Sequence, residues 1–195
     1  MIAGAVLAGG KSLRFGRNKA FEKLGGKRLI DLAVESLRPF CDPVMIVAND
    51  IEPYLDIAVM MARDVVPNLG PLGGIYTALL FSPVEWVFVK ATDMPFLVSE
   101  LASVIIEARE GYEAVVPTVG GFEEPLLALY NRACLSEIAR QLKESDRHRA
   151  KDFYRKIRIR TLSEAEWRRV DPAGLSFKNV NTLSDLAEID GLERS

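Results

Sequence analysis

Short apolar runs alternate with segments of helical periodicity along this chain of 195 residues. Apolar runs bounded by turn residues are typical of buried strands, whereas apolar residues spaced three and four apart indicate an amphipathic helix. Helical spacing predicts helices around 29–37, 75–81 and 98–109, and Pro39 ends the first of them. The apolar runs predict strands over 2–7, 44–48, 57–61, 86–89, 114–117 and 126–130.

This alternation favours an α/β fold. Short buried strands separated by helices are typical of a three-layer sandwich, in which helices cover both faces of a mostly parallel sheet. The sequence contains no internal repeat, low-complexity tract or linker. A chain of this length can bury a proper core on its own. We therefore expect a single domain, residues 1–195.

Composition narrows the class of protein. Apolar residues make up 49% and charged residues 27%, and the formal net charge is −2, so no general affinity for nucleic acid or anionic membranes is expected. Cys41 and Cys134 are far apart and lack metal-ligand spacing, which predicts two reduced, buried thiols. We expect no signal peptide, because the first residues are predicted to form a strand, and no apolar run approaches the roughly 20 residues that cross a bilayer. We expect a soluble cytoplasmic protein.

The first predicted strand ends in a turn that is rich in glycine and cations. The adjacent residues Gly9 and Gly10 allow a sharp turn whose bare N–H groups form a concave anion site. Arg14 and Lys19 add positive charges, and an arginine can grip phosphate oxygens in a fork. The glycine spacing matches neither the Walker loop nor the dinucleotide fingerprint. The turn predicts a triphosphate cradle, with a basic surface loop as the alternative.

Polar residues follow three more of the predicted strands. Ligands of such sheets bind at the carboxyl ends of the strands. Asn49 can present a donor and an acceptor to the edge of a base, and Asp64 can accept from the N1–H and amine of guanine; turn formation is the alternative for both. Asp93 follows the strand 86–89 and suits Mg²⁺, which takes one or two carboxylates plus phosphate oxygens. An N-cap or turn role is its alternative.

The second half carries weaker signals. Glu124 follows a hairpin-like turn and could shape an acceptor pocket, although we favour an exposed turn glutamate. Cations dominate residues 147–160, which predicts either a solvated face or contacts to a phosphorylated ligand. The single histidine, His148, lies in this run, so no arrangement for acyl transfer is available and a hydrolase is excluded.

Four motifs resemble the molybdenum cofactor guanylyltransferases, which are nucleotidyltransferases of the nucleotide-diphospho-sugar transferase fold. Residues 7–19 match L-A-G-G-x-S-x-R-M-G-x-D-K except at Phe15 and Asn18, changes that we expect to affect neither Arg14 nor Lys19. Residues 70–74 match G-P-L-A-G with glycine at the alanine position, residues 92–96 match C-D-x-P-F with threonine for cysteine, and residues 177–186 match F-x-N-x-N-T-P-x-D-L with leucine for proline.

The resemblance implies a reaction and a set of site residues. The terminal phosphate of molybdopterin attacks the α-phosphorus of GTP in line, and pyrophosphate leaves. The resemblance implies that Arg14, Lys19 and Asp93 are catalytic and that Asp93 holds Mg²⁺. The resemblance implies GTP contacts from Leu7, Ala8, Gly9, Gly10, Lys19, Asn49, Asp64 and Asp93, and acceptor contacts from Asn179 and Asn181.

Two alternatives remain open. A related nucleotidyltransferase could use CTP or another phosphorylated acceptor on the same scaffold, and a non-catalytic nucleotide-binding protein could retain the same turn. The resemblance also implies contacts with other proteins of molybdenum cofactor biosynthesis or molybdoenzyme maturation.

Overall fold

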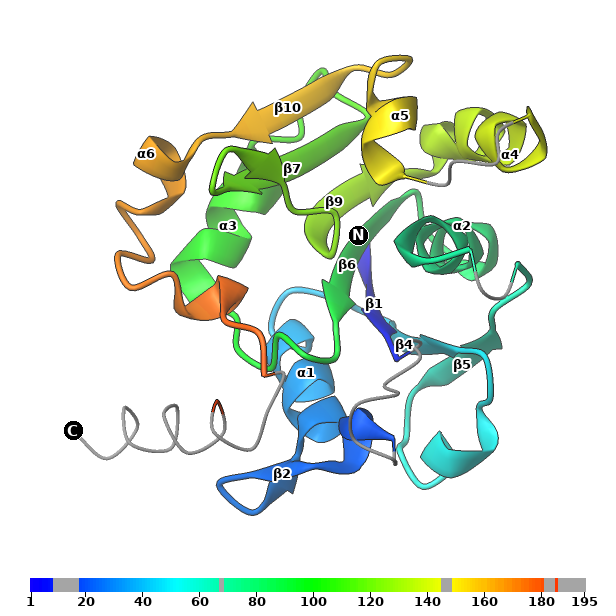
Figure 1. Cartoon of the computed structure of the whole chain (residues 1–195), viewed down its shortest axis with the longest axis vertical. Helices are drawn as coiled ribbons and strands as arrows, with labels where there is room; N and C mark the ends of the chain where they lie inside the picture. Colours follow the sequence, from blue (N-terminus) through cyan, green and yellow to red (C-terminus); the bar gives the residue numbers. More distant parts are fainter. Residues whose placement is uncertain (9–17, 67–68, 145–148, 181–184, 186–195) are drawn as a thin grey trace.

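A computed structural model describes residues 1–8, 18–66, 69–144, 149–180 and 185 of the chain. Within these residues, eight strands form the main sheet, in the order β10-β7-β9-β6-β1-β4-β5, and β8 pairs with β7 (Figure 1). The strands are β1 (Ile2–Leu7), β4 (Val44–Ala48), β5 (Met60–Arg63), β6 (Trp86–Ala91), β7 (Ala114–Val119), β8 (Phe122–Glu123), β9 (Leu127–Asn131) and β10 (Ile159–Leu162).

The centre of the sheet is parallel. Strand β1 pairs in parallel with both β4 and β6, and β4 pairs in parallel with β5. Strand β9 is antiparallel to its neighbours β6 and β7. Nearly all of β1, β4 and β6 is buried, as expected for strands that are covered on both faces. The prediction of a mostly parallel, mixed sheet is confirmed.

Helices cover both faces of this sheet and complete three layers. Side chains of α1 (Leu29–Leu37) and α3 (Ser99–Glu107) pack in one apolar cluster, to which β1 contributes Val6. Side chains of α2, α4 and α5 pack in a second cluster on the opposite face, to which β1 contributes Leu7. Neighbouring residues of β1 therefore enter different layers, because side chains alternate along a strand. The second group comprises α2 (Pro71–Phe81), α4 (Leu135–Glu144) and α5 (Ala150–Tyr154) (Figure 1).

Short elements decorate the three layers. Strands β2 and β3 form a separate antiparallel hairpin, and a four-residue helix follows β10. These elements and the 3₁₀ helices are β2 (Lys23–Leu24), β3 (Lys27–Arg28), α6 (Glu164–Trp167), η1 (Lys19–Phe21), η2 (Glu52–Tyr54), η3 (Arg132–Cys134) and η4 (Leu175–Phe177).

Several predicted boundaries were wrong. The strand expected at 57–61 is β5, at Met60–Arg63, and the helix expected to begin at residue 75 begins at Pro71. The helix expected over 98–109 is shorter, at Ser99–Glu107. The cation-rich stretch 147–160 contains α5 and part of β10, neither of which was expected.

Both cysteines are free and buried, as predicted. Burial raises the pKa of the Cys41 thiol to about 12, and burial together with the nearby Glu113 carboxylate raises the pKa of Cys134 to about 12. Both therefore stay protonated near neutral pH. None of the helices in the described residues is long and apolar enough to span a membrane.

Helix α2 begins in close contact with the turn that follows β5. An added Cβ at Gly73 would lie 2.7 Å from the backbone oxygen of Val66 and 3.4 Å from Oδ2 of Asp64. At Gly74, an added Cβ would lie 2.9 Å from Cδ1 of Leu7. Packing against a backbone oxygen therefore requires glycine at position 73.

We expect Gly73→Ala to lower the free energy of unfolding by about 1–3 kcal/mol, because the new methyl group forces the Val66 backbone to move. This loss outweighs the helix propensity that alanine gains over glycine, about 1 kcal/mol. Chemical denaturation measures the difference, with the exposed helical substitution Glu107→Ala as the control. Unchanged or increased stability of Gly73→Ala would show that this turn adapts freely.

Candidate active site

An ion pair joins two of the predicted site residues. Lys19 begins η1, and Asp93 lies in the turn that directly follows β6. Nζ of Lys19 lies 3.2 Å from Oδ2 of Asp93, and the two side chains are 14% and 36% exposed. A cation and a carboxylate distant in the sequence thus meet beside the carboxyl ends of β1 and β6, partly open to solvent.

The end of β1 fixes the turn that carries Asp93. The backbone N–H and the hydroxyl of Thr92 both donate to the carbonyl of Leu7, at 3.2 and 3.0 Å. Thr92, which replaces the cysteine of the related motif, therefore ties the turn to β1 rather than only facing away from it. The carbonyl of Asp93 accepts from the N–H of Val180 at 2.8 Å, which brings the C-terminal motif to the same turn.

Asn18 positions Lys19. Its Oδ1 accepts from the N–H of Ala20 at 3.1 Å and caps η1, while its Nδ2 donates to the hydroxyl of Tyr54 at 2.8 Å. Tyr54 in turn donates to the carbonyl of Ala8 at 3.3 Å. An aspartate at position 18 would accept from Tyr54, whereas asparagine donates and leaves the tyrosine proton for Ala8. Asn18 thus links the start of η1, where Lys19 lies, to the backbone after β1 through Tyr54.

Sequence reasoning missed a buried lysine below the same turn. Nζ of Lys90 donates to the carbonyl of Pro95 at 3.0 Å and to the hydroxyl of Ser36. Lys90 is fully buried, and this burial lowers its pKa well below the usual value. Its signal in the sequence is a single charge within the apolar strand W-V-F-V-K-A. The hydrogen bond to Pro95 anchors the segment after Asp93 to the core.

Asn49 and Asp64 follow two paired strands. Ala48 of β4 and Arg63 of β5 are partners in the ladder, so the next residues on both strands lie at one edge of the sheet. Oδ1 of Asp64 accepts from the N–H of Val66 at 3.0 Å and from the Thr77 hydroxyl at 2.8 Å. The turn role of Asp64 is therefore confirmed, whereas its contact with a base stays a prediction.

The amide of Asn49 differs from the Asp64 carboxylate in its environment. Asn49 is exposed, and no hydrogen bond engages its side chain within the part of the chain that the structure describes. Its neighbour Asp50 makes the local turn by accepting from the N–H of Glu52 at 3.2 Å. The hydrogen bond of this turn thus comes from Asp50, and the contact of Asn49 with a base stays a prediction.

The remaining predicted residues fall into two groups. Gly9, Gly10, Arg14 and Asn181 lie outside the described residues. Leu7, Ala8 and Asn179 are described: Leu7 ends β1, Ala8 donates to the Val47 carbonyl at 2.8 Å, and Asn179 is exposed beside Val180.

The second half of the chain corrects one expectation. Glu124 is half-buried rather than exposed, and its Oε1 accepts from the N–H of Leu126 at 3.0 Å. Burial raises the pKa of Glu124, the hydrogen bond from Leu126 lowers it, and the Asp93 carboxylate raises it further. In the cationic stretch, Arg158 and Arg160 pair with Glu113 and Glu166.

The chain matches a known protein family in sequence. Residues 4–162 match the family model of the MobA-like NTP transferase domain. A molybdenum cofactor guanylyltransferase of Desulfosudis oleivorans is 39% identical over 97% of this chain and 94% of its own length. A probable molybdenum cofactor guanylyltransferase of Pelotomaculum thermopropionicum is 35% identical over 95% of this chain and 90% of its own.

Solved structures share the fold. Molybdopterin-guanine dinucleotide biosynthesis protein A from Archaeoglobus fulgidus has a TM-score of 0.83 and 26% identity, covering 100% of this chain and 99% of that one. A 2-C-methyl-D-erythritol 4-phosphate cytidylyltransferase from Thermus thermophilus has a TM-score of 0.69 at 15% identity, with 98% of each chain covered. The fold is thus that of the nucleotide-diphospho-sugar transferases. The chain belongs to the MobA-like NTP transferase family, and it is a nucleotidyltransferase.

Proposed function

We propose that this nucleotidyltransferase is a molybdenum cofactor guanylyltransferase, which transfers GMP from GTP to the phosphate of molybdopterin and releases pyrophosphate. One observation carries the proposal: Lys19 and Asp93 meet at 3.2 Å beside the end of β1. The named activity of the 39% identical relative, which aligns over almost the full length of both chains, supports the same reaction.

Lys19 would bind the phosphates of the nucleotide. The Lys19 side chain is only 14% exposed, so its charge lies nearer the protein interior and interacts with an incoming phosphate more strongly than the charge of a fully exposed lysine does. Gly9, Gly10 and Arg14 would complete the cradle with N–H groups and a second cation. No protein nucleophile is needed, since positioning and charge neutralisation suffice for phosphoryl-type transfer.

Asp93 would hold a divalent metal ion, which we propose is Mg²⁺. The donor set fits, because Mg²⁺ commonly binds through one or two carboxylates and completes its shell with substrate phosphates and water. Within the described residues, no cluster of three or more acidic, histidine or cysteine side chains forms an all-protein metal cage. The bound ion would neutralise charge that develops on the α-phosphate, while Thr92 and Lys90 keep the Asp93 turn in place.

Asn49 and Asp64 would select the base. The exposed Asn49 amide offers a donor and an acceptor. Oδ1 of Asp64 already accepts from the Val66 N–H and the Thr77 hydroxyl, so Oδ2 would be the oxygen that accepts from the base. Guanine presents an N1–H and an exocyclic amine together, which suits a carboxylate. Of the backbone groups, the Leu7 carbonyl already accepts two hydrogen bonds from Thr92, so the Ala8 carbonyl is the better acceptor for the base.

Asn179 and Asn181 would contact the acceptor. The hydrogen bond from Val180 to the Asp93 carbonyl supports this role for Asn179, because it holds the neighbouring residue at the metal turn. GTP and molybdopterin would be the substrates, proteins of cofactor biosynthesis or molybdoenzyme maturation the partners, and the cytoplasm the location.

A direct assay tests the reaction and the choice of base. Incubation of the chain with GTP, Mg²⁺ and molybdopterin is expected to release pyrophosphate and form the guanine dinucleotide. With CTP we expect at least tenfold lower kcat/KM, because cytosine lacks the N1–H that Asp64 would accept. Equal use of CTP would favour the cytidylyltransferase alternative, and absence of pyrophosphate with either nucleotide would favour a non-catalytic binding protein.

We expect Asp93→Asn to lower kcat by about a hundredfold or more, because the amide keeps the shape but loses the charge that holds the metal ion. The fold should persist, since an ion pair that is partly open to solvent contributes about 1 kcal/mol or less to stability. Pyrophosphate release and thermal unfolding are measured together, with Glu100→Gln, an exposed carboxylate in the first turn of α3, as the control. A fully active Asp93→Asn protein would refute the metal role.

A further inference from the structure

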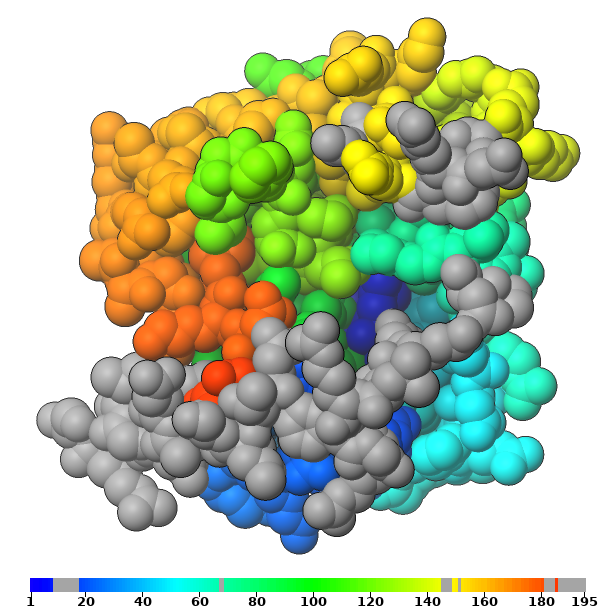
Figure 2. Space-filling model, in the orientation of Figure 1, coloured from blue at the N-terminus to red at the C-terminus, as the bar shows by residue number. Residues whose placement is uncertain are grey.

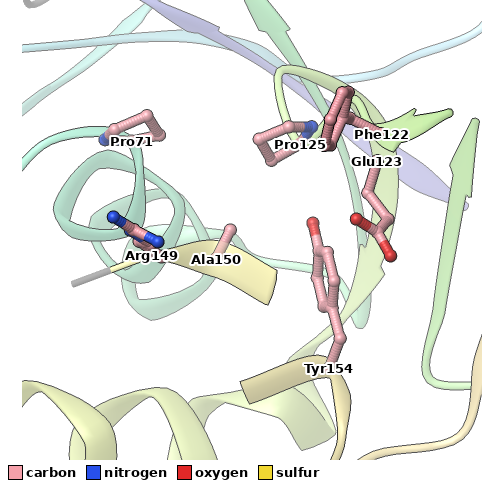
Figure 3. A pocket seen from close by; sticks show the side chains of 7 residues that line it. All are labelled: Pro71, Phe122, Glu123, Pro125, Arg149, Ala150 and Tyr154. Atoms are coloured by element: carbon pink, nitrogen blue, oxygen red, sulfur yellow. The ribbon is translucent and has the colours of Figure 1, made fainter. Parts of the chain in front are cut away.

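A cavity of about 300 Å³ lies between the start of α2, the β7–β8 hairpin and α5. On the face shown in Figure 2, the hairpin (green), α2 (teal) and α5 (yellow) come together beside the first strand (dark blue). The walls of the cavity combine aromatic and proline rings with one cation and one anion. The lining residues are Pro71, Phe122, Glu123, Pro125, Arg149, Ala150 and Tyr154 (Figure 3).

The aromatic walls of the cavity are placed differently. Tyr154 is buried, and its hydroxyl lies 2.6 Å from the hydroxyl of Tyr130, which also donates to the Pro125 carbonyl at 3.0 Å. Tyr154 is thus a fixed part of the wall. Phe122 is 72% exposed beside the turn of the hairpin. A flat ring bound in the cavity would cover it.

The two charges stand on opposite sides. Figure 3 shows Arg149 and Ala150 on one side, Phe122 and Glu123 on the other, and the ring of Tyr154 between them. Arg149 and Glu123 are both exposed, and neither forms an ion pair within the residues that the structure describes. A flat ligand between them would meet guanidinium donors at one edge and carboxylate acceptors at another.

The cavity adjoins the candidate active site. Glu124, next to Glu123, is half-buried, and its Oε1 accepts from the N–H of Leu126 at 3.0 Å. Two residues further on, the Leu126 carbonyl accepts from the N–H of Ala91 at 2.9 Å, at the end of β6. One wall of the cavity therefore continues directly to the strand that precedes Asp93. A ligand with its rings in the cavity could extend a phosphate toward Asp93.

We propose that this cavity is the subsite for the heteroaromatic rings of the acceptor, a pterin, with Phe122 and Tyr154 as apolar walls and Arg149 and Glu123 as polar contacts. The proposal rests on the proposed function for the identity of the acceptor. A pterin is a flat fused bicycle whose edge carries an amide carbonyl, an N–H and an amino group, so it needs both a donor and a carboxylate. Arg149 is thereby the member of the cationic stretch that we assign to the acceptor.

Pterin itself, which is fluorescent, provides the direct test. We expect it to bind the full chain, and we expect Phe122→Ala to weaken binding about fivefold or more through lost stacking. Arg149→Met should weaken it similarly, whereas Arg155→Met, an exposed cation of the same stretch that does not line the cavity, should not. Since Phe122 and Arg149 are exposed, their variants should keep the wild-type melting temperature. No binding by the wild-type protein, or equal binding by all four proteins, would overturn the proposal.

Two further measurements separate this subsite from the rest of the mechanism. GTP affinity, measured by calorimetry, should change less than twofold in Phe122→Ala and Arg149→Met, and a loss equal to that for pterin would place the cavity in the nucleotide site instead. In the transfer assay, both variants should raise the KM for molybdopterin about fivefold or more at an unchanged KM for GTP. Wild-type protein that binds pterin in the cavity but transfers no GMP would contradict the proposed function alone. Normal transfer with unchanged acceptor KM in both variants would contradict the subsite alone.

Discussion

The carbonyl of Leu7 is the point on which the site depends. It accepts both the N–H and the hydroxyl of Thr92, so the last residue of β1 is locked to the turn that carries Asp93. Parallel pairing of β1 and β6 brings the two strand ends together, and these two hydrogen bonds set where the next carboxylate stands. Lys19 then approaches the same carboxylate from η1. A cation and a carboxylate suited to bind a metal ion therefore lie together because the ends of β1 and β6 are joined.

Other contacts hold each half of this pair from behind. Asn18 and Tyr54 link the start of η1 to the Ala8 carbonyl, and Lys90 holds the carbonyl of Pro95 from within the core. A buried lysine is costly to desolvate, and its hydrogen bonds to the Pro95 carbonyl and the Ser36 hydroxyl offset part of this cost while they fix the backbone after Asp93. An active site that works by positioning charges needs such supports, because small displacements weaken both phosphate and metal contacts.

Sequence patterns could predict the centre of this molecule. The runs at 2–7 and 44–48 coincide with β1 and β4, because strands buried on both faces must be continuously apolar. We expected Lys19 to lie near Asp93 because the carboxyl ends of parallel strands share one edge of the sheet. The two residues do form an ion pair. The first turn of α2 was not predicted because it contains glycines at 73 and 74, whose role is close packing rather than helix propensity. Helix α5 and strand β10 were not predicted because their segment is rich in arginine and lysine. The burial of both elements depends on the rest of the fold. The cap by Asn18 and the anchor at Lys90 are long-range contacts, so no local pattern marks them.

The central claim is that Lys19 and Asp93 surround one metal-bound triphosphate. The most direct measurement is anomalous scattering from crystals grown with Mn²⁺ and a GTP analogue that has a methylene group between its α- and β-phosphates. The claim predicts a metal peak in coordination contact with the Asp93 carboxylate, with the triphosphate beside the Lys19 ammonium. A nucleotide and metal ion that both lie away from Lys19 and Asp93 would contradict it.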